Sequence, residues 1–219
     1  VGIAVTPYID LYETIAGKLV KLASPASIPS SSVNDVLYSP DGTYLALAIS
    51  ASPYILIYKL FGDTYIKLTD PVTLPTGEPT KVAWSSDSTY LAISHTNSPY
   101  VTIYKNTADV FTKLANPGTL PTGVGRGCSF TKDNTYLAVT HDTSPYITIY
   151  KRAADVFTKL TDPGVLPTNA GRGCAFTLDG AYLTIITATT PFIVTYKRAV
   201  DVFTKLADPA VLPPSTPTD

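Results

Sequence analysis

The stretch Ser98-Pro-Tyr-Val-Thr-Ile-Tyr104 decides the fold, because a segment of the same form, Ser/Thr-Pro-aromatic-x-x-x-Tyr, occurs five times in the chain. Successive copies are 46 residues apart, and they begin at Thr6, Ser52, Ser98, Ser144 and Thr190. A repeat of about 40 to 50 residues that contains several short strands is typical of the blades of a β-propeller. The spacing therefore predicts an all-β propeller generated by copying one unit.

Alternating side chains and turn residues predict four strands in each unit, and no window shows a helical period. In one unit these strands are expected at Gly127–Phe130, Tyr136–Thr140, Tyr146–Lys151 and Val156–Leu160. Both faces of the third strand carry apolar or small side chains. We therefore expect antiparallel four-stranded blades, each packed between two neighbours.

The repeat predicts a single propeller domain over residues 1–216, followed by a tail at 217–219. Its complete units are 33–78, 79–124, 125–170 and 171–216, whereas residues 1–32 align only with the last three strands of a unit. The prediction is about five blades, four of them complete and one three-stranded. Three explanations of the partial unit stay open. The chain is a fragment or processed product, it closes a five-blade ring with one incomplete blade, or a partner, including a second copy, donates the missing strand.

The segment Ser39-Pro-Asp-Gly-Thr-Tyr-Leu-Ala, followed by Tyr54-Ile-Leu-Ile-Tyr-Lys, resembles a blade of the WD40 type, in the divergent form found in bacteria and phages. This resemblance covers almost the whole chain and implies a binding scaffold. The Trp-Asp pair of that family is replaced by Tyr-Lys, as at Tyr58-Lys59. We therefore expect tyrosine packing between blades in place of the family's hydrogen-bond network.

Charge is sparse, with a net charge of −1 and a pI near 6.1. Nine of the 16 basic residues are lysines of two repeat columns, which we interpret as solvated rim residues: Lys21, Lys67, Lys113, Lys159 and Lys205 in one, and Lys59, Lys105, Lys151 and Lys197 in the other. This pattern predicts no nucleic-acid partner. No apolar run approaches the length of a membrane span, and no signal segment opens the chain, so no membrane insertion is expected.

Cysteine use does not identify a compartment. Cys128 and Cys174 occupy the repeat position that holds Val36 and Val82 in the other units. We therefore expect each to be a small buried apolar residue and not half of a disulfide. Such thiols fit the cytoplasm, a virion or a cell surface equally. The richness in Thr, Ser, Pro and Tyr favours a virion or an extracellular surface.

The residues that could carry catalytic chemistry have structural interpretations. The column Asp41, Asp87, Asp133 and Asp179 lies in turns of the Pro-Asp-Gly kind, where aspartate bonds to its own backbone. His95 and His141 vary within their column, but equivalent positions on adjacent blades are too far apart to share a zinc ion. We expect no catalytic residue, no cofactor and no metal.

Positions that vary between units are the candidates for ligand contact. The loop after the second strand holds His95, Asn97, His141 and Asp142, and the segment that leads into the inner strand holds Asn34, Lys81, Arg126 and Arg172. The resemblance to propellers implies that both sets lie on one face, around the central channel. The arginines would donate to carboxylates or carbonyls of a partner, or else to carbonyls of neighbouring blades.

Three classes of function follow from these observations. The favoured class is a non-enzymatic interaction or scaffold module that binds protein partners, in a phage tail, fibre or capsid accessory, or on a bacterial surface. A glycan-binding propeller lectin is the alternative, because polar and aromatic loops around a ring suit multivalent sugar binding. A hydrolase is third, because the sequence shows no convergent acid and base.

Overall fold

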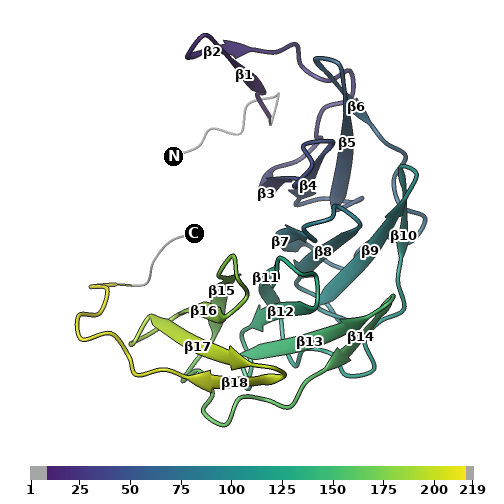
Figure 1. Cartoon of the computed structure of the whole chain (residues 1–219). Helices are drawn as coiled ribbons and strands as arrows, with labels where there is room; N and C mark the ends of the chain where they lie inside the picture. Colours follow the sequence, from purple (N-terminus) through teal and green to yellow (C-terminus); the bar gives the residue numbers. More distant parts are fainter. Residues whose placement is uncertain (1–8, 216–219) are drawn as a thin grey trace.

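The computed structural model describes residues 9–215 and shows only β-strands and connecting segments in that range. Four sheets have four antiparallel strands each, and a fifth sheet has two. In every four-stranded sheet consecutive strands pair, from an inner strand near the centre of the molecule to an outer strand at its rim (Figure 1). We number these sheets blade 1 to blade 4. The predicted all-β, propeller-like architecture is confirmed.

The strands repeat with nearly constant lengths. The N-terminal hairpin consists of β1 (Tyr12–Ile15) and β2 (Lys18–Lys21). Blade 1 consists of β3 (Val33–Tyr38), β4 (Tyr44–Ile49), β5 (Ile55–Phe61) and β6 (Thr64–Lys67). Blade 2 consists of β7 (Pro79–Trp84), β8 (Tyr90–His95), β9 (Val101–Thr107) and β10 (Val110–Lys113). Blade 3 consists of β11 (Gly125–Phe130), β12 (Tyr136–His141), β13 (Ile147–Ala153) and β14 (Val156–Lys159). Blade 4 consists of β15 (Gly171–Phe176), β16 (Tyr182–Thr187), β17 (Ile193–Ala199) and β18 (Val202–Lys205).

The blades stand face against face in an open arc, with the hairpin at one end and blade 4 at the other (Figure 1). Strands β4, β8 and β12 are buried along their whole length, because a neighbouring sheet covers each face. Strand β16 alternates between half-buried and buried residues, because only one of its faces is covered. Of the predicted partial blade, β1 and β2 are present, and the strand expected before them falls outside the described residues.

The heptapeptide that marks the repeat forms the connection into the third strand of each blade. In blades 1 to 4 its Ser/Thr-Pro bond is cis, and the aromatic residue that follows has φ between 64° and 68°. The last tyrosine of the heptapeptide is at most 1% exposed in every blade, and its column is Tyr58, Tyr104, Tyr150 and Tyr196. Each hydroxyl donates to a backbone carbonyl of the connection that precedes its blade, at 2.8 to 2.9 Å. The repeated tyrosine therefore ties each sheet to its connecting segment.

The aspartates of the Pro-Asp-Gly-like turns do what the sequence predicts. In blade 1, Asp41 accepts a hydrogen bond from the Ser39 hydroxyl at 2.5 Å and another from the Thr43 backbone N–H at 3.0 Å. The same pair of bonds recurs at Asp87, Asp133 and Asp179. These bonds hold the turn between the first and second strands, which gives the whole column a structural role.

A three-residue contact, which we call the clamp, joins each blade to the next. In the first clamp the hydroxyl of Tyr44 and the ammonium of Lys59 both donate to Asp109, at 2.6 and 2.8 Å. The second and third clamps are Tyr90 and Lys105 with Asp155, and Tyr136 and Lys151 with Asp201, at the same distances. The lysine hydrogen bond, followed by that from the tyrosine, lowers the pKa of each aspartate.

The clamp corrects the interpretation of the rim lysines as merely solvated. Lys59, Lys105 and Lys151 bind across blade junctions. In the outer-strand column Lys67, Lys159 and Lys205 pair with an aspartate three residues later. The expected tyrosine packing between blades is present, since Tyr44 lies edge-on to Phe111 with ring centroids 5.7 Å apart.

Candidate functional site

A β-bulge occurs at the same place in every inner strand. The pairing register shifts between Val33 and Asp35 in blade 1, and at the corresponding residues of the other blades. A bulge leaves one residue unpaired and redirects its side chain. The bulged residues are Asn34, Thr80, Arg126 and Arg172. Three of the four candidate residues of this segment are therefore at bulges, and in blade 2 the bulge is at Thr80, one residue before Lys81.

The two sets of candidate loops do lie at the same end of each blade. Gly125 pairs with His141, so the start of the inner strand lies beside the end of the second strand. The segments before and after these strands also touch. Asn97 donates to the Thr76 carbonyl at 2.9 Å, and a Cβ on Gly123 would lie 2.6 Å from an oxygen of Asp142. The two sets therefore share one end of each blade, which we call the loop face, and their place around a central channel stays a prediction.

Arg126 and Arg172 occupy equivalent bulges on adjacent blades. The inner strands approach closely just after them, since a Cβ on Gly127 would lie 2.9 Å from the Cα of Gly173. Arg126 donates to Asp142 of its own blade at 3.0 Å, and its Nε is buried without a hydrogen-bond partner. Arg172 is exposed, and among the described residues its guanidinium has no hydrogen bond or ion pair. Blade 4 has Ala188 where blade 3 has Asp142, which removes the counter-charge.

The corresponding residues of blades 1 and 2 hold the junction between those blades. Asn34 donates to Glu78 at 3.0 Å and to the Pro79 carbonyl at 2.9 Å. Asp35 accepts a bond from the Val82 backbone N–H at 2.8 Å and lies 3.5 Å from the Lys81 ammonium. Sequence reasoning missed the acidic residues Asp35 and Glu78, although Asp35 directly follows Asn34 and Glu78 precedes Lys81 by three residues. Asn34 and Lys81 thus have structural partners that Arg172 lacks.

The two histidines are inside the blades, which corrects their placement in an exposed loop. His95 and His141 are the last residues of β8 and β12, and both are wholly buried. In each case Nε2 lies 3.0 Å from a threonine hydroxyl of the next strand, Thr102 or Thr148. Burial lowers the pKa of both, that of His95 to about 4. A ligand at the loop face cannot reach either ring.

The inner strands line a cavity of about 340 Å³ on the concave side of the arc. Its lining comes from all four blades and includes Asp35, Lys81, Cys128, Cys174 and Ile186. The thiols are free, and burial raises the pKa of Cys128 to about 12, so that thiol stays protonated at neutral pH. The described residues contain no group of three or more His, Cys, Asp or Glu side chains that could hold a metal ion.

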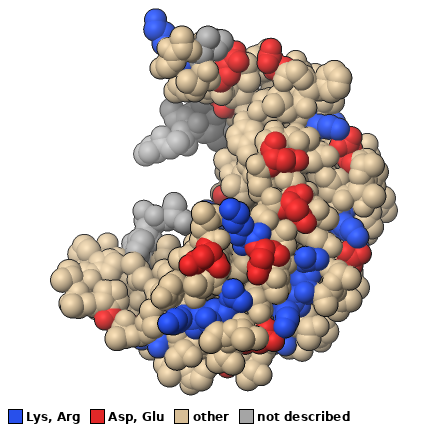
Figure 2. Space-filling model, viewed as in Figure 1, with Lys and Arg blue, Asp and Glu red and all other residues tan. Residues whose placement is uncertain are grey.

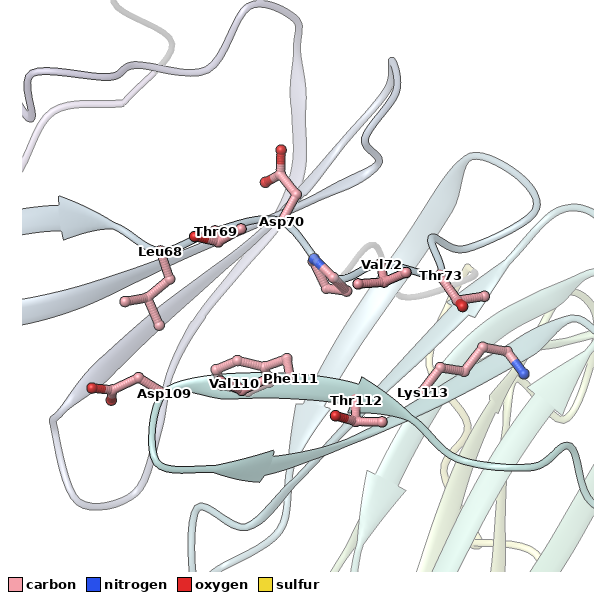
Figure 3. A pocket seen from close by; sticks show the side chains of 11 residues that line it. Leu68, Thr69, Asp70, Val72, Thr73, Asp109, Val110, Phe111, Thr112 and Lys113 are labelled. Atoms are coloured by element: carbon pink, nitrogen blue, oxygen red, sulfur yellow. The ribbon is translucent and has the colours of Figure 1, made fainter.

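A larger hollow of about 510 Å³ lies at the rim, between the connection Leu68–Thr73 and strand β10. Figure 3 shows Leu68 and Phe111 on its two sides, with Asp109 of the clamp at one end and Lys113 at the other. Its lining includes Leu68, Asp109 and Lys113, which belong to columns that are identical in all four blades. We therefore interpret it as the seam between two blades.

Acidic and basic side chains are interspersed over the face of the molecule that Figure 2 shows. In the described part of the chain, the clamps and the pairs along the outer strands each set a lysine beside an aspartate. This distribution differs from the single basic stripe expected of a nucleic-acid-binding surface. Within residues 9–215 there is also no helix of the length and hydrophobicity needed to cross a membrane.

Neither a protein-family profile nor a curated protein sequence matches this chain. Solved structures do resemble it. A candidate 6-phosphogluconolactonase from Bacteroides uniformis has a TM-score of 0.72 and 16% identity, over 94% of this chain and 66% of its own. A second one, from Bacteroides fragilis, has a TM-score of 0.73 and 14% identity, over 94% of this chain and 65% of its own. The WD40 repeats of RRP9 have a TM-score of 0.60 and 14% identity, over 81% of this chain and 51% of theirs.

Identities this low show the fold alone. The chain shares its repeated four-stranded blades with propellers, including WD40 repeats, and spans 65 to 66% of the length of the two candidate lactonases. One fold of this kind supports both enzymes and scaffolds.

Proposed function

We propose that this chain is a non-enzymatic interaction module of the divergent bacterial or phage WD40 type. It binds a protein partner through its loop face, in a virion or on a bacterial surface. The observation that carries this proposal is the exposed guanidinium of Arg172, which has no counter-charge among the described residues and stands on a bulge beside that of Arg126. A free guanidinium next to a second arginine suits a carboxylate, which it can bind through two parallel hydrogen bonds.

The differences between blades support the same assignment. Asn34, Thr80 and Arg126, at the equivalent bulges of blades 1 to 3, have partners within the fold, whereas Arg172 in blade 4 lacks the partner that Arg126 has and keeps its charge. A residue that served only the fold would be expected to keep its partner in every copy. We therefore place the recognition of acidic side chains or of a chain terminus at blades 3 and 4.

The test is calorimetric titration of the purified chain with a short peptide rich in Asp and Glu. Arg172→Ala should weaken binding about tenfold or more, since a charged hydrogen bond contributes roughly 1.5 to 3 kcal/mol. Lys132→Ala is the matched control. It removes an exposed positive charge just after the end of the inner strand β11, whereas Arg172 is near the start of the inner strand β15. Equal binding by the wild type and Arg172→Ala, or a loss of thermal stability with binding intact, would contradict the proposal.

A second candidate, hydrolysis of a sugar lactone, is favoured by the resemblance to the two candidate lactonases. Incubation of the chain with 6-phosphogluconolactone, followed by acid release, tests it directly. We expect the rate to equal that of the spontaneous reaction, because both histidines are buried away from the loop face. Glycan-array binding with one sugar per blade would instead favour the lectin alternative.

A further inference from the structure

The two ends of the arc carry complementary halves of the clamp. Blade 4 has the donors, Tyr182 and Lys197, in the columns of Tyr44 and Lys59. Neither the Tyr182 hydroxyl nor the Lys197 ammonium has a hydrogen bond among the described residues. Blade 1 has the acceptor, Asp63, in the column of Asp109, and its carboxylate is exposed and without a partner in the described range. After the three clamps inside the described range are formed, the donors of blade 4 and the acceptor of blade 1 are left without a clamp partner.

The inner parts of the two end surfaces match in the same way. At the junction of blades 1 and 2, Val82 and Trp84 are 5% and 6% exposed, because they pack against Ala46 and Ala48. Their equivalents at the open end of blade 1, Val36 and Tyr38, are 50% and 46% exposed. An apolar pair that is buried at the junction of blades 1 and 2, and buried or half-buried at the other two junctions, is therefore uncovered at this end.

The open face of blade 4 has the same strands as the matching faces of blades 1 to 3, but it carries more polar side chains. Where blades 1 to 3 have buried alanine and isoleucine, blade 4 has Thr184 and Thr195, whose hydroxyl oxygens lie 3.2 Å apart. Ile186 and Ile193 stay half-buried beside them. Two hydroxyls bonded to each other lower the cost of exposing this face without blocking a partner. Such a surface suits an interface that forms and separates.

We propose that the open face of blade 4 binds blade 1 of a second copy of this chain, head to tail. Asp63 of the second copy accepts hydrogen bonds from Tyr182 and Lys197 and so completes a fourth clamp. Val36 and Tyr38 of that copy lie against the Thr184 face, as Val82 and Trp84 lie against Ala46 and Ala48. Contact between two different patches produces a closed ring or an extending chain of copies, depending on its angle.

The N-terminal hairpin competes for the same face of blade 1. Leu11 packs with Leu45 and Leu47, so the second copy binds only where the hairpin moves aside. The hairpin covers this face only in part, because Val36 and Tyr38 stay about half exposed, and Glu13 in the column of the clamp lysine has the same sign of charge as Asp63. Association should therefore be reversible and dependent on concentration.

Sedimentation velocity of the full chain over a wide range of concentration tests the proposal. The wild type should associate, and Lys197→Glu and Asp63→Lys should each weaken association about tenfold through like-charge contacts. The double variant should restore it, because the pair is reversed, and Lys132→Glu should leave it unchanged. The proposal would be overturned by a wild type that stays monomeric. It would also be overturned if neither single change weakened association, or if the double variant did not restore it. These changes lie far from Arg172 in sequence and on end surfaces, so acidic-peptide binding by the same variants reports separately on the loop face.

Discussion

At the scale of single residues, the histidines show how a varied position can still be structural. His95 is buried at the end of β8, and burial lowers its pKa to about 4. An unfolded chain holds the same imidazole near pKa 6.5. Between these values the unfolded state binds the extra proton, so the free energy of unfolding falls as the pH drops from about 6.5 to about 4.

His95→Thr tests this directly, because blade 4 has the buried Thr187 in the same column. The wild type should lose roughly 3 kcal/mol more of its unfolding free energy than the variant between pH 6.5 and 4. Urea denaturation at a series of pH values measures both curves. Parallel curves for the two proteins would show that the ring is protonated without cost in the fold.

The inner strands need glycine where they approach one another, as at Gly127. A Cβ at Gly127 would lie 2.9 Å from both the Cα of Gly173 and the hydroxyl of Thr140. Gly127→Ala should therefore destabilise the fold by about 1 to 3 kcal/mol through overpacking. Gly164→Ala is the control, since nothing lies within 4 Å of its Cβ position. Chemical denaturation of the two variants compares them, and equal midpoints would mean that the strands can separate freely.

At the scale of the blade and its junction, the clamp is the contact that can be removed most cleanly. Asp155→Ala deletes the acceptor for Tyr90 and Lys105, and should cost about 1 kcal/mol because the carboxylate is partly exposed. Asp63→Ala changes the same column where there is no donor, and should stay within about 0.5 kcal/mol of the wild type. Thermal unfolding at low protein concentration measures both.

The difference between these variants should also depend on pH. The clamp lowers the pKa of Asp155 in the folded state, so its contribution is present above the unfolded value near 3.9. It is lost as the pH falls further, through the folded value. Asp155→Ala and the wild type should therefore converge in acid, and a difference that persists unchanged at pH 2 would assign the effect to packing.

The sequence predicts most of each blade and little of what joins the blades. Alternation identifies strands such as β12 and β14 within one residue, because side-chain pattern reflects burial directly. It starts β11 two residues late, since Gly125 and Arg126 have no strand preference and form a bulge. The clamp was not predicted, because Tyr90 and Asp155 are 65 residues apart in sequence and come into contact only when two sheets pack at a particular angle. The one sequence feature that could have indicated the clamp is that its Tyr, Lys and Asp positions are each occupied by the same residue type in all four blades.

At the scale of the whole molecule, the main contacts of each blade in the described range are with its neighbours, so stability should vary along the arc as in other repeat proteins. Amide hydrogen exchange should be slowest in β8 and β12, which are buried throughout, and faster in β16. It should be fastest in the hairpin strand β2, which is exposed throughout. Uniform protection from β2 to β18 would mean that the arc unfolds as one unit.

The clamp has a consequence for how the gene can change. Its three residues come from the same columns at every junction, so excision of residues 79–124 would bring Tyr44 and Lys59 to Asp155 in place of Asp109. The new seam would have the same chemistry as the one removed, and insertion of an extra unit would be accommodated equally well. Recombination between copies can therefore lengthen or shorten the protein while every surviving seam still fits, which makes blade number a heritable variable that the fold itself does not fix.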